Sequence, residues 1–251
     1  MTTPHDVNSP VFLITGAGKG LGRSIAEAIL GDPARHGNPR LLLTSRTGRD
    51  LVSLRELAPP GVHVEVLPLE LSVDPVGPVR LAVEKFGRID AVLHCAGVGR
   101  FGDFLELTRD DLESTMQTNV EASFLFMQGA YAQMKSQGLA HPGIKHRGDL
   151  VWITSVAAVR PFEQSAIYCM SKYAQRGLIE VMRLYGRRDG IRILDVRPGA
   201  ALTPMWGDVD PATASTMMRA RDVAQAILDA LLINPRASVE EIVIRPIGGD
   251  L

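Results

Sequence analysis

Cysteine is nearly absent from this chain. Cys95 and Cys169 are its two cysteines among 251 residues, and neither stands at a spacing typical of metal ligands. Disulfide-stapled secreted scaffolds and cysteine-based zinc folds carry several closely spaced cysteines. The cysteine content therefore excludes both classes, and it is typical of a protein of the reducing cytoplasm.

Long hydrophobic runs and an excess of charge of one sign are also lacking. No run of about 18 apolar residues occurs, so we expect no membrane span. The 27 basic and 28 acidic residues give a net charge of −1, which argues against nucleic acid or an acidic membrane as partner. Residues 1–10 are polar and lack the apolar core of a signal peptide, so we expect a flexible tail.

Short apolar segments alternate with segments of helical periodicity along the chain. Apolar segments predict seven strands, at 11–15, 41–45, 62–69, 91–95, 150–154, 191–196 and 241–245. The segments between them predict helices at 20–30, 50–57, 75–86, 110–137, 165–188 and 210–232. Strands that are apolar throughout and alternate with helices indicate a parallel sheet covered on both faces. We therefore expect one α/β domain over 1–251, Rossmann-like and doubly wound, with a mainly parallel seven-stranded sheet.

A glycine-rich turn follows the first predicted strand and opens the first predicted helix. It reads Thr15-Gly-Ala-Gly-Lys-Gly-Leu-Gly, with glycines at 16, 18, 20 and 22. Glycines at such a place let the backbone approach a pyrophosphate and direct free N–H groups at it. The position between strand and helix favours dinucleotide binding over a merely tight turn.

The end of the second predicted strand bears on the choice of cofactor. Units that bind NAD usually place an acid here for the ribose hydroxyls. This chain has Arg46 instead, and Lys19 lies inside the glycine-rich turn. Either cation alone is compatible with a solvated surface charge, but two cations without a carboxylate favour the 2′-phosphate of NADPH.

A hydroxyl, a phenol and an ammonium are predicted to meet in one cleft. Tyr168 and Lys172 are four residues apart on a predicted helix, so their side chains share a face. Ser155 follows the fifth predicted strand. A cation beside a phenol stabilises the phenolate, which suits a group that transfers protons at neutral pH.

Together these motifs resemble those of the short-chain dehydrogenase/reductase family. The resemblance is carried by Thr15–Gly22, Ala96-Gly97, Asn119, Ser155, Tyr168-x-x-x-Lys172 and Pro198-Gly199-x-x-x-Thr203, in the order of the family. A closer similarity, to bacterial sepiapterin reductases, is carried by Ala96–Gly102, Ile167–Lys172, Thr203–Gly207 and Arg245–Asp250.

The resemblance implies a role for each matching residue. Tyr168 would protonate the substrate carbonyl, Ser155 would hydrogen-bond its oxygen, and Lys172 would hold the nicotinamide ribose and favour ionisation of Tyr168. Asn119 would hold a water behind Lys172, although a locally satisfied amide is the alternative. Contacts to NADP(H) are implied for Gly16, Gly18, Lys19, Gly20, Leu21, Gly22, Arg46, Glu70, Leu71, Ala96, Gly97, Tyr168, Lys172, Pro198, Gly199 and Thr203.

The sequence departs from the family pattern at two places. His94-Cys95 stands where the family has two asparagines, and we expect His94 to be a hydrogen-bonded structural residue rather than a catalyst. Glu70 stands where the family has an aspartate that meets the adenine. The longer side chain can still reach the adenine amine, or that contact rests on the Leu71 backbone.

The resemblance to sepiapterin reductases leaves the substrate contacts open. Trp206 can stack on a bicyclic pterin or pack a lid onto the core, and Asp250 can bind the amino-pyrimidine edge of a pterin or remain a solvated terminal carboxylate.

The sequence thus predicts an NADPH-dependent carbonyl reductase, similar to sepiapterin reductase, with no bound metal and a small carbonyl substrate. A reductase or alcohol dehydrogenase for a ketone other than a pterin is one alternative. A dinucleotide-binding sensor without turnover is another, which the full set of catalytic residues disfavours. Members of the family dimerise through the helices predicted at 110–137 and 165–188, so we expect a homodimer or homotetramer.

Overall fold

Hydrophobic segments that are buried on both faces form the centre of this protein. The computed structural model describes residues 9–140 and 143–249. Within these residues seven parallel strands form one sheet in the order β3-β2-β1-β4-β5-β6-β9. Their bounds are β1 Val11–Thr15, β2 Arg40–Ser45, β3 Val64–Pro68, β4 Ala91–His94, β5 Gly148–Ile153, β6 Ile191–Pro198 and β9 Glu241–Ile244. The predicted Rossmann-like, doubly wound fold is confirmed.

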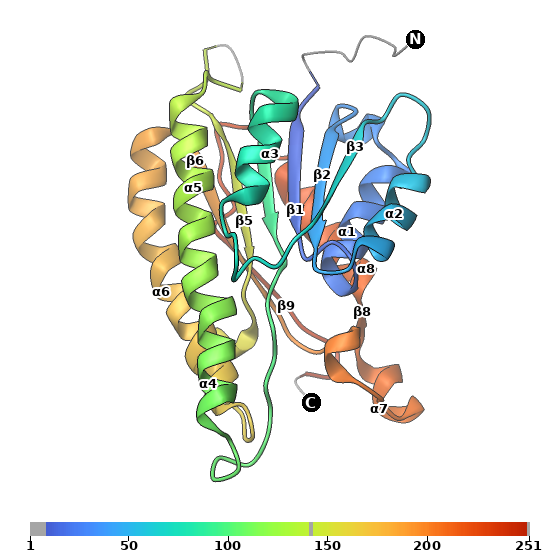
Figure 1. Cartoon of the computed structure of the whole chain (residues 1–251), viewed down its shortest axis with the longest axis vertical. Helices are drawn as coiled ribbons and strands as arrows, with labels where there is room; N and C mark the ends of the chain where they lie inside the picture. Colours follow the sequence, from blue (N-terminus) through green and yellow to red (C-terminus); the bar gives the residue numbers. More distant parts are fainter. Residues whose placement is uncertain (1–8, 141–142, 250–251) are drawn as a thin grey trace.

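Helices cover both faces of the sheet (Figure 1). One face carries α1 (Gly20–Gly31), α2 (Gly48–Glu56) and α8 (Ala220–Leu231), whereas α3 (Gly77–Phe86), α5 (Ser123–Ser136) and α6 (Ala166–Asp189) cover the other. The segment predicted as one helix over 110–137 is helical throughout, but it consists of α4 (Arg109–Met116), a π-helical turn η2 (Gln117–Ala122) and α5.

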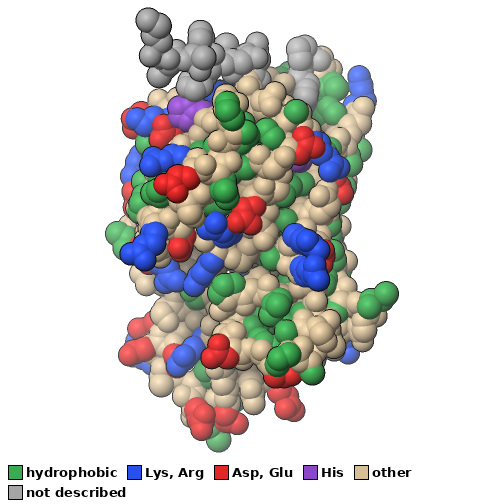
Figure 2. All heavy atoms as spheres, turned by 90° about the vertical axis from the view of Figure 1, so that its right-hand side faces the viewer, with side chains coloured by type: hydrophobic (Ala, Val, Ile, Leu, Met, Phe, Trp, Pro, Cys, Tyr) green, Lys and Arg blue, Asp and Glu red, His purple; other side chains and the backbone are tan. Residues whose placement is uncertain are grey.

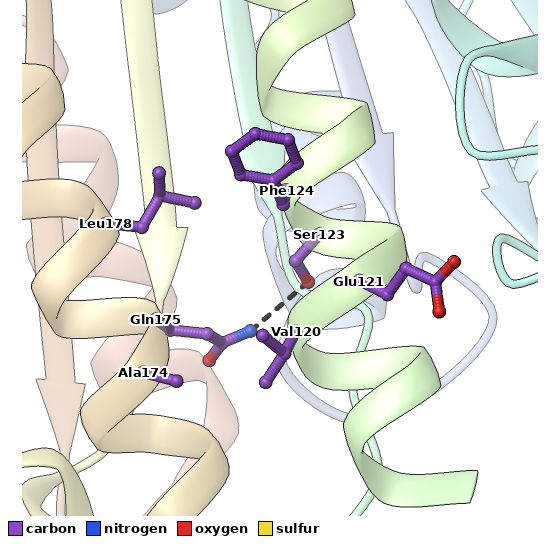
Figure 3. A pocket seen from close by; sticks show the side chains of 7 residues that line it. All are labelled: Val120, Glu121, Ser123, Phe124, Ala174, Gln175 and Leu178. Carbon is purple, nitrogen blue, oxygen red and sulfur yellow. Dashed lines mark hydrogen bonds between the residues drawn. The ribbon is translucent and has the colours of Figure 1, made fainter. Parts of the chain in front are cut away.

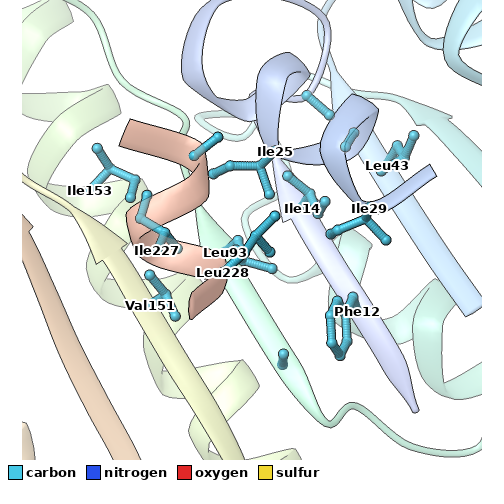
Figure 4. Packing of buried hydrophobic residues seen from close by; sticks show 14 of the residues in the cluster. Phe12, Ile14, Ile25, Ile29, Leu43, Leu93, Val151, Ile153, Ile227 and Leu228 are labelled. Carbon is cyan, nitrogen blue, oxygen red and sulfur yellow. The ribbon is translucent and has the colours of Figure 1, made fainter. Parts of the chain in front are cut away.

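Each face has its own hydrophobic core. Figure 4 shows the first, in which Ile25 and Ile29 of α1 and Ile227 and Leu228 of α8 pack on Ile14 and its neighbours in the sheet. The second core lies under α3, α5 and α6 and contains the largest fully buried side chains, Trp152 and Phe126. Removal of this much apolar surface from water is the main favourable contribution to folding.

The prediction of one continuous helix over 210–232 is wrong, because the helix is interrupted in its middle. The chain forms α7 (Pro211–Thr216) and then adopts an extended backbone conformation at Met217. The short strand β8 (Met218–Arg219) pairs with β7 (Ala201–Leu202) before α8 begins. Asp222 accepts a hydrogen bond from Arg219 N at 2.9 Å and so starts a new helix. The apolar residues at helical spacing, Val223, Ala224, Ile227 and Leu228, all lie in α8, and α7 buries none.

The crevice of the fold lies where the order of the strands reverses. β1 pairs with β2 on one side and with β4 on the other, so the chain leaves the carboxyl ends of β1 and β4 toward opposite faces. Open parallel sheets bind ligands outside the carboxyl ends of the strands at such a point. The glycine-rich turn after β1 and the loop after β4 border this crevice.

The surface is mixed in charge on the side that carries α2. Figure 2 shows acidic and basic side chains interspersed there among apolar ones. Across the ranges 9–140 and 143–249, no helix is both long and apolar enough to cross a membrane.

Candidate active site

The glycine-rich turn is held close to the loop after β4. Gly16 and Gly20 have φ angles of 65° and 59°, in the left-handed region that favours glycine. A methyl group added at Gly16 would lie 2.8 Å from Ala96 N, and one at Gly22 would lie 2.5 Å from Gly16 O. Side chains at these positions are therefore sterically excluded, and the turn packs backbone against backbone.

The amino end of α1 is open to an anion. Lys19 occupies the N-cap position without a capping hydrogen bond from its side chain, and the first turn contains no acidic residue. The first N–H groups of a helix lack partners within the helix, and the helix dipole favours negative charge beside them. Leu21 and Gly22 lie in this first turn. Such a terminus is suited to a pyrophosphate.

Two of the predicted cofactor residues, Arg46 after β2 and Glu70 after β3, lie close together. Arg46 is exposed, and its Nε lies 3.9 Å from Glu70 Oε2, while Ser72 donates a hydrogen bond to Glu70 at 3.3 Å. Leu71, next in the chain, is buried. The carboxylate of Glu70 is thus turned toward a cation rather than extended alone into solvent.

The structure brings the remaining predicted cofactor residues to the same edge. A methyl group at Gly20 would lie 3.5 Å from Thr203 Cβ, so the glycine-rich turn faces the segment after β6. A methyl group at Gly97 would lie 3.7 Å from Lys172 Nζ. Pro198 ends β6, and Gly199 N donates to Ile244 O at 2.8 Å. The glycine-rich turn and the loop after β4 therefore border one crevice together with α6 and the segment after β6.

Ser155, Tyr168 and Lys172 converge beside this crevice. Ser155 follows β5 and caps a short 3₁₀ turn, where its Oγ accepts from Ala157 N at 3.1 Å. Tyr168 lies in the first turn of α6, and Lys172 Nζ is 5.6 Å from the centre of its ring. All three side chains are buried. The predicted meeting of hydroxyl, phenol and ammonium is present.

The acidity of Tyr168 differs from the sequence-based expectation. Burial raises the pKa of Tyr168 to about 12, and a hydrogen bond from Ser155 lowers it by less. The ammonium of Lys172 was expected to lower this pKa, but its protons are directed elsewhere, to Ile153 O at 3.2 Å and Gln175 Oε1 at 3.0 Å. At neutral pH Tyr168 is therefore protonated, which is the form that donates a proton.

The surroundings of Lys172 make its ammonium a stronger acid than that of a lysine in water. Burial lowers the pKa of Lys172 to about 8, while the negative charge of Asp195 opposes that shift. The group thus changes charge near neutral pH rather than far above it.

Asn119 lies inside the π-helical turn η2 and is completely buried. Its side chain bonds both backbone groups of Val98, with Nδ2 donating to the carbonyl and Oδ1 accepting from the N–H, each at 2.8 Å. Nδ2 also donates to Ser171 Oγ at 3.0 Å. The side-chain amide is thus locally satisfied, and the Asn119 backbone carbonyl faces Gln175. π-Turns within helices are frequent at functional sites.

His94 is a hydrogen-bonded structural residue, as expected. Its ring hydrogen-bonds Thr15 Oγ1 at 2.8 Å and Ser123 Oγ at 2.9 Å, and it lies between Phe126 and Trp152. Burial, together with the nearby charge of Lys172, lowers its pKa to about 3. A neutral imidazole therefore ties β1 to the helix that follows β4.

Aromatic rings other than Trp206 stand nearest to Tyr168. The Phe101 ring centre lies 5.1 Å from that of Tyr168 and 6.2 Å from that of Phe162. Both phenylalanines are half exposed, and sequence reasoning missed them because they come from two loops far apart in the chain. Trp206 ends the short turn Pro204–Trp206 and is 45% exposed, while Asp250 lies outside the described residues.

Comparisons with known proteins identify relatives of this chain. The profile of the family described as short chain dehydrogenase matches residues 10–214. The chain is 43% identical to sepiapterin reductase of Chlorobaculum tepidum, over 96% of this chain and 98% of that protein. It is 30% identical to L-xylulose reductase of Bos taurus, over 92% and 84% of the two chains. An alcohol dehydrogenase of Thermococcus sibiricus, solved with 5-hydroxy-NADP, superposes with a TM-score of 0.83 at 25% identity, covering 95% of this chain and 97% of that one.

Proposed function

Because this chain belongs to the short-chain dehydrogenase family of oxidoreductases, we propose that it is an NADPH-dependent carbonyl reductase similar to sepiapterin reductase. The observation that carries the proposal is the convergence of Ser155, Tyr168 and Lys172 beside the glycine-rich turn. A bound dihydronicotinamide supplies the hydride in such a reaction. The side chains of this protein must then bind the carbonyl and deliver a proton.

Tyr168 is the proton donor in this mechanism. Its phenol is protonated at neutral pH and meets Ser155, which is placed to hydrogen-bond the same carbonyl oxygen. As negative charge develops on that oxygen, the phenol proton moves to it and the Lys172 ammonium stabilises the phenolate left behind. Lys172 also holds the nicotinamide ribose, through Nζ at the Gly97 side of the crevice.

The chain fits the cofactor at both ends of the crevice. The open amino end of α1 and the close-packed glycines suit a pyrophosphate, with Leu21, Ala96, Leu71, Pro198, Gly199 and Thr203 as further contacts. Arg46 and Lys19 are exposed cations at the ribose end, which supports a 2′-phosphate. The similar Thermococcus sibiricus structure holds an NADP derivative, which supports the same cofactor.

The surroundings of Tyr168 favour a planar substrate. Phe101 presents a half-exposed ring beside the phenol, and the half-exposed ring of Phe162 lies next to Phe101. A conjugated bicyclic ring such as a pterin gains apolar contact and stacking there, whereas a sugar-like ketone, as implied by the name L-xylulose reductase, leaves its hydroxyls against apolar rings. Trp206 is a second stacking candidate from the segment after Thr203.

Consumption of NADPH with a panel of carbonyls tests the proposal. The parent should reduce sepiapterin faster than diacetyl or L-xylulose. Tyr168→Phe should bind NADPH as the parent does but lose about 10²–10⁴-fold in turnover, because only the transferable proton is removed.

Three results would contradict parts of this function. If Tyr168→Phe keeps turnover within a few-fold of the parent, another group donates the proton. If diacetyl is reduced and sepiapterin is not, the assignment as a carbonyl reductase holds and the assignment of a pterin substrate is wrong. Binding of NADPH with no turnover of any carbonyl would favour the alternative of a dinucleotide-binding sensor without turnover.

Self-association is part of the proposal. A pocket of about 340 Å³ lies between the η2–α5 segment and α6, lined by Val120, Glu121, Ser123, Phe124, Ala174, Gln175 and Leu178 (Figure 3). Phe124, Leu184 and Tyr185 of the same helices are exposed. A second copy of the chain would cover this apolar surface, and sedimentation velocity should detect a dimer or tetramer.

A further inference from the structure

A buried glutamine stands directly behind the lysine of the site. Gln175 lies one turn along α6 from Lys172, and its Oε1 accepts a hydrogen bond from Lys172 Nζ at 3.0 Å. Gln175 is only 2% exposed. A polar side chain so deeply buried costs free energy unless its hydrogen bonds are made, and this one makes them toward the ammonium.

The other end of the Gln175 amide is fixed by the π-helical turn. Its Nε2 donates to Asn119 O at 2.7 Å and to Ser123 Oγ at 3.2 Å. In this turn the Ser123 N–H is directed to Val120 O, so the carbonyl of Asn119 points to α6. Figure 3 shows Gln175 reaching across from α6 to Ser123. Both ends of one planar amide are thus held.

The contacts continue to the strand that carries the glycine-rich turn. Ser123 Oγ bonds His94 Nε2 at 2.9 Å, and His94 Nδ1 bonds Thr15 Oγ1 at 2.8 Å. Thr15 Oγ1 accepts from Ala96 N at 3.2 Å. One buried polar chain therefore joins the end of β1 to Lys172.

We propose that Gln175 is a positioning residue for Lys172, which keeps the ammonium charged and aimed at the crevice. The inference rests on the proposed function for the role of Lys172 in turnover. A neutral amide accepts at oxygen and donates at nitrogen, so Gln175 cannot pass a proton onward as a hydroxyl or a water can. It therefore orients Lys172 and is not a member of a proton relay.

The effect of Gln175 on the pKa of Lys172 is measurable because charged and titratable groups surround Lys172. The groups that face Lys172 are Tyr168 on its own helix, Asp195 on β6, and His94 and Cys95 at the end of β4. An acceptor at 3.0 Å favours the ammonium over the neutral amine. Loss of the acceptor must therefore lower the pKa of Lys172, and a carboxylate in its place must raise it.

The test compares Gln175→Leu with Gln175→Glu in the pH profile of kcat for carbonyl reduction. Gln175→Leu should move the alkaline limb to lower pH by about one unit and reduce kcat at pH 8 by roughly fivefold. Gln175→Glu should move the same limb to higher pH. The control Ile179→Ala removes buried volume from the same helix and should leave the limb in place.

A second readout needs no turnover. The pKa of Lys172 in the folded chain is about 8, below its ordinary 10.5, so the unfolded state binds the extra proton between these values and the melting temperature rises with pH. Lys172→Met should remove this rise between pH 8 and 9.5. In Gln175→Leu the rise in melting temperature should begin at lower pH, and in Gln175→Glu it should begin at higher pH.

The two readouts separate the possible failures. If the parent reduces no carbonyl, the proposed function is wrong, and the melting series still decides the role of Gln175. If the parent reduces carbonyls but Gln175→Leu follows the parent in both series, Gln175 does not act on Lys172. A shift of both Gln175 variants in the same direction also overturns the inference, because it indicates a loss of packing alone.

Discussion

Acid titration of His94 should account for a large part of any loss of stability at low pH. The ring is 1% exposed and enclosed by Phe126 and Trp152, and burial lowers its pKa to about 3. The same side chain titrates near 6.5 in an unfolded chain. Below pH 6.5 the unfolded state therefore binds a proton that the folded state excludes, so stability is lost as the pH falls toward 3.

The size of the effect follows from the two pKa values. Each pH unit below 6.5 lowers the free energy of unfolding by about 1.4 kcal/mol. His94 alone should thus remove about 2 kcal/mol at pH 5 and roughly 5 kcal/mol at pH 3. Domains are typically stable by only about 5–15 kcal/mol, so one residue can decide whether the fold survives in acid.

Urea unfolding at pH 7.5 and pH 5.0 measures this contribution. The parent should lose about 2 kcal/mol more over this interval than His94→Asn, in which the titrating ring is gone. The subtraction between two pH values removes the loss that the substitution causes at both. Equal losses in parent and variant would refute the reasoning. Where the variant does not fold, ring-proton NMR of the parent gives the answer, because His94 should not titrate between pH 8 and 5.

Four further substitutions test the crevice. Arg46→Ala should weaken NADPH tenfold or more relative to NADH, because only the 2′-phosphate loses a partner; equal weakening in a fluorescence titration would exclude this role. Gly22→Ala should abolish cofactor binding and lower the melting temperature, since its methyl group would lie 2.5 Å from Gly16 O; unchanged binding would contradict the close packing. Trp206→Ala and Phe101→Ala should raise the KM for sepiapterin but not for diacetyl; equal effects on both substrates would mean that the rings only hold their loops in place.

Much of the fold was predictable because its signals are local. β1 was predicted at its observed bounds, and its burial along the whole length gives a continuous apolar run. Short local motifs also predicted much of the site, namely the glycine-rich turn, Arg46, and the pair Tyr168 and Lys172. These elements carry most of the crevice.

The rest depends on contacts between distant segments. Gln175 is one more polar residue on a long helix until Asn119 and Ser123 are placed beside it. Phe101 and Phe162 meet only when two loops fold toward Tyr168. The raised pKa of Tyr168 depends on burial, which the spacing of Tyr168 and Lys172 does not report.

The order of the strands also affects the protein while it is being made. The amino-terminal strand β1 pairs with β2 as soon as residue 45 is available, but its other neighbour, β4, ends only at His94. Ribosomes add roughly 5–20 residues per second, so one edge of β1 waits about 3–10 seconds for its partner. An apolar strand with an open edge is a template for pairing with other chains. The nascent polypeptide is therefore exposed to aggregation through this edge before the first hundred residues have emerged.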